Sequence, residues 1–146
     1  MEITREFIST VFIVKDGRVL MTWNNKINNW IPIGGHIESN ELPCDSVIRE
    51  AKEESGLDIE IIYPFEKSET ANLSQPVHIH LDHIKDDHEH INFIYFGIVK
   101  DGRCLEIDDE GKELKWFSRE DLEKESLLPN IKEWAIKSLN QLGEKY

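Results

Sequence analysis

Three glutamates near the middle of the chain could hold a divalent cation. Glu50, Glu53 and Glu54 lie in one short segment, and on a helix, at about 100° per residue, they fall within an arc of roughly 100°. The i,i+4 pair of Glu50 and Glu54 is unfavourable by roughly a few tenths of a kcal/mol. A hard cation such as Mg²⁺ reverses this penalty, because its preferred ligands are oxygens. The alternative is a solvated acidic face, which is ordinary in a chain of net charge −12.

The surrounding sequence predicts the helix that would carry these glutamates. Pro43 is well placed as a first helical residue, because the first turn does not need its N–H. Gly56 is typical of the position just past a helix end. We therefore predict a helix over residues 43–55. Its apolar side chains fill a separate arc that would pack against a sheet, and they are Cys44, Val47, Ile48 and Ala51.

The rest of the chain is predicted to form mainly strands. Two Asp-Gly steps, in residues 15–17 and 100–102, are strong hairpin signals. The first hairpin would pair residues 7–14 with 18–23, and the second would pair 91–99 with 104–107. Further strands are predicted at 30–33, 57–62 and 77–84. In the last segment Val77, Ile79 and Leu81 alternate with polar residues, so we expect a half-buried strand.

A short turn and one more helix are expected towards the C-terminus. The short turn, over residues 119–124, follows Ser118, a good N-cap. The helix opens at Pro129 and stops before Gly143, with apolar residues spaced at 3.6-residue intervals. Because strands come first and helices are inserted, we predict an α/β fold with a mixed sheet covered by helices on its faces. Its length of 146 residues suits a single domain spanning residues 1–146.

The composition narrows the range of partners. Acidic residues outnumber basic ones by 29 to 17, which argues against binding nucleic acid through its phosphates. We find no apolar window near the roughly 18 residues of a membrane span, and the start has no signal-peptide pattern. Cys44 and Cys104 lack metal-ligand or redox spacing, so we expect free thiols in a reducing cytoplasm. An anionic substrate would therefore need an intervening cation.

Residues 35–57 carry a more specific pattern. Gly35, Glu41, Arg49 and the three glutamates, followed by Gly56, occupy the fixed positions of G-x5-E-x7-R-E-U-x-E-E-x-G-U, where U is aliphatic. The segment thus resembles the box of the Nudix (MutT-like) hydrolases. Ala51 is smaller than usual at its position, and Ile33 separates Pro32 from the glycine pair. The resemblance continues outside the box at Trp30, Pro32, Trp116, Phe117, Glu120 and Asp121.

This resemblance implies both a fold and a chemistry. The fold is an α/β/α sandwich around a central mixed sheet, and the activity is hydrolysis of a nucleoside diphosphate linked to another group, with Mg²⁺ or Mn²⁺. The implied metal ligands are Glu50, Glu53, Glu54 and the Gly35 carbonyl. Arg49 would orient the glutamates with Glu41 as its ionic partner, or alternatively pair with Asp45 on the helix surface. The catalytic residues expected by resemblance are Glu53, Glu50, Arg49 and Glu41. Glu53 is our first choice as general base, and Glu110 and Glu113 are the loop alternatives.

The substrate is expected to be a small nucleotide, either a nucleoside di- or triphosphate or a nucleotide sugar. Our candidates for substrate contact are Trp30, Glu38, His90, Glu110 and Glu113. His90 belongs to a group of five histidines between residues 78 and 90. These could line a substrate cleft as a polar sheet face, form a zinc site, or lie on the surface; we favour the cleft.

Two other kinds of function remain open at this point. One is a nucleotide-binding or regulatory domain without turnover, although the intact glutamates argue against it. The other is an isomerase of isoprenyl diphosphates, which would need a catalytic cysteine in the cleft. Cys44 lies on the apolar arc and is expected to pack, whereas Cys104 is left open as a candidate. By analogy with the family we also expect a homodimer.

Overall fold

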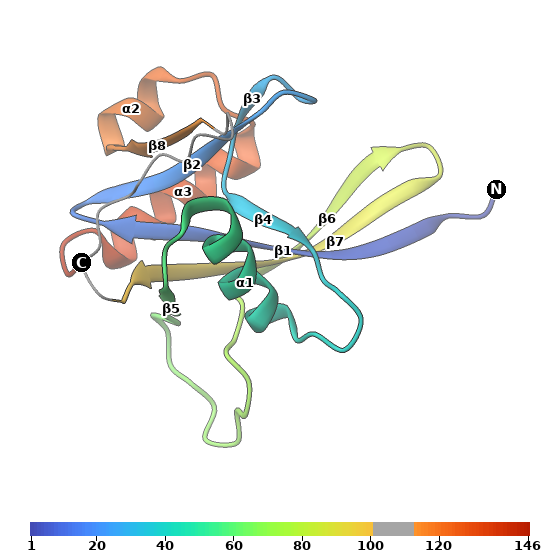
Figure 1. Cartoon of the computed structure of the whole chain (residues 1–146), viewed down its shortest axis with the longest axis horizontal. Coiled ribbons are helices and arrows are strands. Elements are labelled where there is room, and N and C mark those ends of the chain that lie inside the picture. The colour runs from blue at the N-terminus through green and yellow to red at the C-terminus, as the bar shows by residue number, and fades with distance from the viewer. Residues whose placement is uncertain (101–112) are drawn as a thin grey trace.

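An eight-stranded sheet and three helices make up the computed structural model, which describes residues 1–100 and 113–146 (Figure 1). The strands are β1 (Thr4–Lys15), β2 (Arg18–Asn24), β3 (Asn29–Ile31), β4 (Ile33–His36), β5 (Ile59–Ile61), β6 (His78–Lys85), β7 (His88–Val99) and β8 (Leu114–Phe117). The helices are α1 (Pro43–Ser55), α2 (Arg119–Lys124) and α3 (Pro129–Leu142).

The sheet is mixed, as predicted. β1 and β7 run parallel at its centre, with eleven residue pairs from Thr4↔His88 to Val14↔Ile98. The other pairings in the described residues are antiparallel. The main strand order is β3-β2-β1-β7-β5, with β4 paired to β1, β6 to β7 and β8 to β2.

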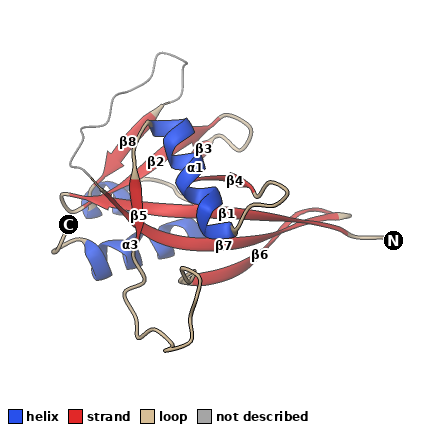
Figure 2. Ribbon diagram, turned by 60° about the horizontal axis from the view of Figure 1, so that its bottom comes forward, coloured by secondary structure: helices blue, strands red, loops and turns tan. Residues whose placement is uncertain are grey.

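Helices cover both faces of this sheet, so the predicted α/β/α sandwich is confirmed (Figure 2). Alternate residues of β1 point to opposite faces. Val11 and Ile13 join a core that includes residues of α1, while Phe12 and Val14 join a second core with residues of α2 and α3. The α1 side chains in the first core are Cys44, Val47 and Ala51. Those of α2 and α3 in the second are Leu122, Ala135, Leu139 and Leu142.

The first predicted hairpin is present. Asp16 and Gly17 form its turn with φ angles of 52° and 70°, as a type I′ turn requires at both central positions. The flanking residues Lys15 and Arg18 are paired across the hairpin. The second Asp-Gly step, at residues 101 and 102, and the predicted strand 104–107 lie outside the described residues.

Both predicted helices are found with the expected bounds, and the segment predicted as a short turn over residues 119–124 forms the helix α2. α1 has Pro43 in its first turn and Gly56 as its C-cap, with a φ of 74° and an N–H that donates to the Lys52 carbonyl. Ile48 was expected on the packed face of α1 but is 40% exposed, so that part of the prediction is wrong. Ile48 lies at the edge of the apolar arc, whereas Cys44 and Ala51 lie nearer its centre and are buried. No helix in the described ranges is long and apolar enough to cross a membrane.

The strand predictions needed two corrections. The predicted strand 30–33 is split into β3 and β4 at Pro32, which has no N–H to contribute to a ladder. In β6, Ile79 and Leu81 are each 55% exposed, so the apolar side of this strand is not covered. The reason is visible in Figure 1, where β6, β7 and the start of β1 extend past the end of α1.

Candidate active site

The helix α1 is held against β1 so that its glutamates lie beside the sheet. Ser46 of α1 and Ser9 of β1 are both buried, and the Ser9 hydroxyl donates to the Ser46 hydroxyl over 2.9 Å. Since the apolar arc of α1 faces the first core, the acidic arc is turned away from it. The Glu50 side chain is 15% exposed and that of Glu53 is 59% exposed.

Arg49 connects the acidic side chains at this end of the molecule. Its guanidinium donates two hydrogen bonds to Glu41, 2.7 Å from Nε to Oε2 and 3.0 Å from Nη2 to Oε1. Nη1 donates to Glu50 over 3.1 Å and to Glu53 over 3.2 Å. Nη2 also donates to the backbone carbonyl of His36 over 3.2 Å. One side chain thus fixes α1 to β4 and to the intervening loop through charge-assisted bonds.

The charges in this network shift the pKa values of its members. The Arg49 hydrogen bonds hold the pKa of Glu41 below its ordinary value, and Glu41 in turn raises the pKa of Arg49. Burial raises the pKa of Glu50, although Arg49 opposes this shift. An additional positive charge beside Glu50 would offset this cost of burying its charged form.

The two glycines of β4, Gly34 and Gly35, occupy positions where a side chain would clash with neighbouring atoms. Neither has a positive φ, so the backbone angles at these positions do not by themselves require glycine. A Cβ at Gly35 would lie 2.5 Å from Oε1 of Glu50, and one at Gly34 would lie 2.3 Å from the Ser9 carbonyl. Gly34 lets β4 approach β1, whereas Gly35 makes room for the Glu50 carboxylate.

This donor set fits a hard divalent cation. The space beside Gly35 holds the Glu50 carboxylate, and Oε2 of Glu54 is buried nearby on the same helix. In the described part of the chain the carboxylates of Glu50, Glu53 and Glu54 do not all lie within 4.8 Å of one another. Glu50 and Glu53 instead converge on the same nitrogen of Arg49. The oxygens are of the type that Mg²⁺ and Mn²⁺ bind.

Comparison with known proteins agrees with this geometry. The model of the NUDIX domain family matches residues 5–142. The chain belongs to the Nudix family. It is 31% identical over 126 residues to "Uncharacterized Nudix hydrolase YvcI" of Bacillus subtilis (strain 168), covering 84% of this chain and 72% of that protein. The chain is therefore a hydrolase with the Nudix fold.

Solved structures show the same similarity. A crystal structure of a NUDIX-family hydrolase from Clostridium perfringens is 34% identical with a TM-score of 0.79, over 96% of this chain and 99% of that chain. A crystal structure of UDP-X diphosphatase has a TM-score of 0.65 over 99% of this chain and 65% of that chain. At 16% identity this second likeness shows the fold alone.

The other residues proposed for this Nudix site are scattered around the box. Glu38 is largely exposed, 3.7 Å from Nη1 of Arg49. Trp30 packs edge-on against Trp23 and Phe117, beside the second core. Glu113 is exposed, and its carbonyl accepts from the Trp23 N–H. Glu110 and Cys104 lie outside the described residues, whereas Cys44 is a free thiol buried in the first core.

The histidines lie on the sheet face that α1 does not cover, except for His83. His78 stacks on Trp134 of α3 with ring centroids 4.7 Å apart. His90 lies near Glu6 and His36, and burial lowers its pKa. Glu6 and His36 were not among the predicted site residues, because the pairing of β1 with β4 and β7 is not encoded locally. The β1 sequence TREFISTVFIVK has no regular alternation that would have marked Glu6.

Proposed function

We propose that this Nudix hydrolase cleaves the pyrophosphate linkage of a nucleoside diphosphate derivative by attack of water at phosphorus, using Mg²⁺ or Mn²⁺. The observation that supports this is the Arg49 network. It gathers Glu41, Glu50 and Glu53 where β4 and α1 meet, beside the Gly35 backbone. A protein of net charge −12 also gains a way to bind an anionic substrate when a cation intervenes.

The proposed metal ligands are Glu50, Glu53, Glu54 and the Gly35 carbonyl. A bound cation neutralises phosphate charge and lowers the pKa of a coordinated water. Arg49 keeps Glu50 and Glu53 in place by donating to both, and Glu41 fixes the guanidinium through its two hydrogen bonds. We assign the role of general base to Glu53, whose carboxylate is open to solvent, with Glu113 and Glu110 as alternatives.

The proposed substrate is a nucleoside di- or triphosphate or a nucleotide sugar. Trp30, Glu38, His90, Glu110 and Glu113 remain our candidates for contacting it. The aromatic ring of Trp30 could stack on a base only through the part that Trp23 and Phe117 leave open.

A panel of nucleoside diphosphate derivatives tests this function, with released phosphate measured in Mg²⁺, in Mn²⁺ and in EDTA. We expect turnover of at least one member that EDTA abolishes. Glu53→Gln should reduce kcat by about 100-fold or more, because it removes a charge from the reacting centre. Glu123→Gln is the matched control, since Glu123 is 58% exposed on α2. Equal activity of the two variants would refute the role of Glu53, and activity in EDTA would refute the need for a metal.

We also propose that the protein acts in the cytoplasm as a homodimer and as one domain over residues 1–146. Light scattering of the purified chain tests the dimer, and a monomer at micromolar concentration would contradict it. Fractionation of the source cells tests the location. Limited proteolysis tests the single domain, for which we expect a stable product close to full length.

A further inference from the structure

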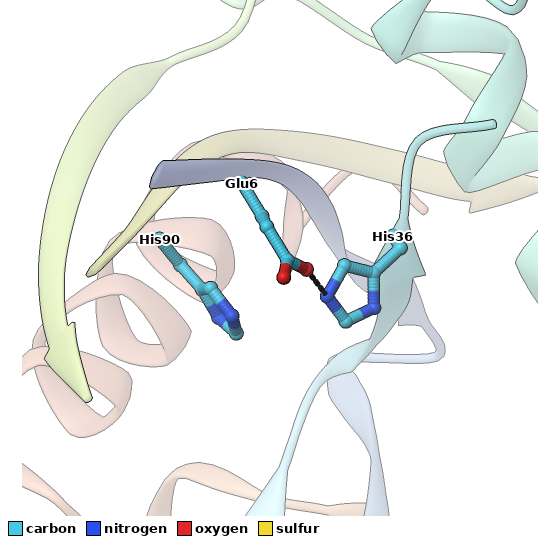
Figure 3. A group of neighbouring side chains, drawn as sticks. All are labelled: Glu6, His36 and His90. Atoms are coloured by element: carbon cyan, nitrogen blue, oxygen red, sulfur yellow. Dashed lines mark ion pairs between the residues drawn. The ribbon is translucent and has the colours of Figure 1, made fainter. Parts of the chain in front are cut away.

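Three strands bring together a second set of metal-binding groups, apart from the glutamates of the Nudix box. Glu6 of β1, His36 of β4 and His90 of β7 each offer a ligand atom, and these atoms all lie within 4.8 Å of one another (Figure 3). Glu6 and His90 are direct partners in the parallel β1–β7 ladder. His36 pairs with Ile8, which is the next residue after Glu6 on the same face of β1. The backbone pairing therefore fixes the Cα positions from which these three side chains project.

This cluster lies on the opposite face of the sheet from the box glutamates. Even-numbered residues of β1 point towards α3, as Phe12 does, while odd-numbered residues such as Val11 point towards α1. Gly35 pairs with Ser9 and contacts Glu50, so His36 projects to the other side. The two sets of ligands thus share the β4 backbone but are separated by the sheet.

A fourth imidazole adjoins the three groups. His88 projects from the same face of β7 as His90, and its Nε2 lies 3.0 Å from Nε2 of His90. The same His88 atom is 3.6 Å from Oε1 of Glu6. The His88 side chain is 17% exposed, while those of Glu6 and His36 are 42% and 61% exposed. Solvent, and with it a dissolved ion, can therefore reach these groups from the side of His36, whereas the side of His88 is largely shielded from solvent.

We propose that Glu6, His36 and His90 form a binding site for a transition-metal ion such as Zn²⁺, with His88 beside it as a further ligand. The ion would take the place of the direct contact between the Glu6 carboxylate and the His36 imidazole. Two imidazoles and one carboxylate are a typical donor set for Zn²⁺, whereas Mg²⁺ prefers an all-oxygen set. The site is consequently distinct in both position and metal preference from the box glutamates.

Zn²⁺ binding to the tag-free full-length chain tests this proposal. Calorimetric titration in the presence of excess Mg²⁺ should show one tight Zn²⁺ equivalent. Replacing Zn²⁺ with Co²⁺ should give the visible absorption of a four-coordinate ion. Failure of the wild-type protein to bind either ion would overturn the proposal.

The variants locate the site. His90→Ala and His36→Ala should each weaken Zn²⁺ binding by more than the about 10–100-fold that loss of an outer-shell partner causes. His83→Ala is the control for His36, because its side chain is 63% exposed and lies on the other face of β6. Glu53→Gln should bind Zn²⁺ normally, which separates this site from the box glutamates. Thermal unfolding without metal identifies a variant that has lost its fold, and His90→Gln then replaces it. Wild-type affinity in the folded variants would refute the assignment.

Discussion

Replacement of Gly35 by alanine should disturb the position of the Glu50 carboxylate while leaving the stability of the fold nearly unchanged. The new Cβ would lie 2.5 Å from Oε1 of Glu50, and ordinary contact begins at 3.4 Å, so the carboxylate must move by about 0.9 Å. The clash is with the far end of a side chain, which can move without disturbing the backbone. We therefore expect the free energy of unfolding to change by less than about 1 kcal/mol. A displacement of about 1 Å can lower a catalysed rate by about 100-fold.

Steady-state hydrolysis and urea unfolding measure these two effects, and Gly34→Ala is the control. A Cβ at Gly34 would lie 2.3 Å from the Ser9 backbone carbonyl, which cannot move aside, so this variant should lose about 1–3 kcal/mol of stability or more. Gly35→Ala should instead lose kcat at nearly unchanged stability. If Gly35→Ala keeps wild-type kcat, the position of the Glu50 carboxylate does not control the reaction and our account of the site is wrong.

Three further variants test other contacts. Arg49→Lys loses the paired hydrogen bonds to Glu41 and should lower kcat/KM by about 10–100-fold with an unchanged circular dichroism spectrum. Asp121→Ala removes the carboxylate of the α2 capping box and should cost about 1 kcal/mol at pH 7 in urea unfolding. The backbone N–H of Ser118 donates to the Asp121 carboxylate and lowers its pKa. The stabilisation by Asp121 is therefore fully present above the ordinary pKa of an aspartate and is lost as the pH falls through the lowered pKa. If Asp121→Ala were still less stable than the wild type in acid, this account would be contradicted. Phe12→Ala empties a fully buried position and should cost about 3–5 kcal/mol, whereas a loss below 1 kcal/mol would show that the second core tolerates the cavity.

Features encoded in short segments were predicted well from the sequence. Pro43 and Gly56 mark the ends of α1 through their own backbone preferences, and the structure has both ends where predicted. Asp16 and Gly17 adopt the positive φ values that their residue types favour. The box pattern likewise placed Arg49 next to Glu41, because both lie in one local loop and helix.

Features that depend on distant pairing were not predicted. The alternation in β6 was identified, but alternation alone does not say whether a helix covers the apolar side, and Ile79 and Leu81 are exposed. Glu6 was not recognised as a neighbour of His90 because 84 residues separate them in the chain. Only the β1–β7 register brings them together.

The central ladder of β1 and β7 also governs how the molecule can form. Each of its eleven pairs joins residues 84 positions apart, so none of them can close until most of the polypeptide is available. Folding rates fall as the sequence separation of contacts increases. During synthesis β1 must therefore leave the ribosome long before β7, when only β2 and β4 can pair with its edges. We expect folding to be slow for a chain of this length, because the central ladder closes only after residues 88–98 have been made.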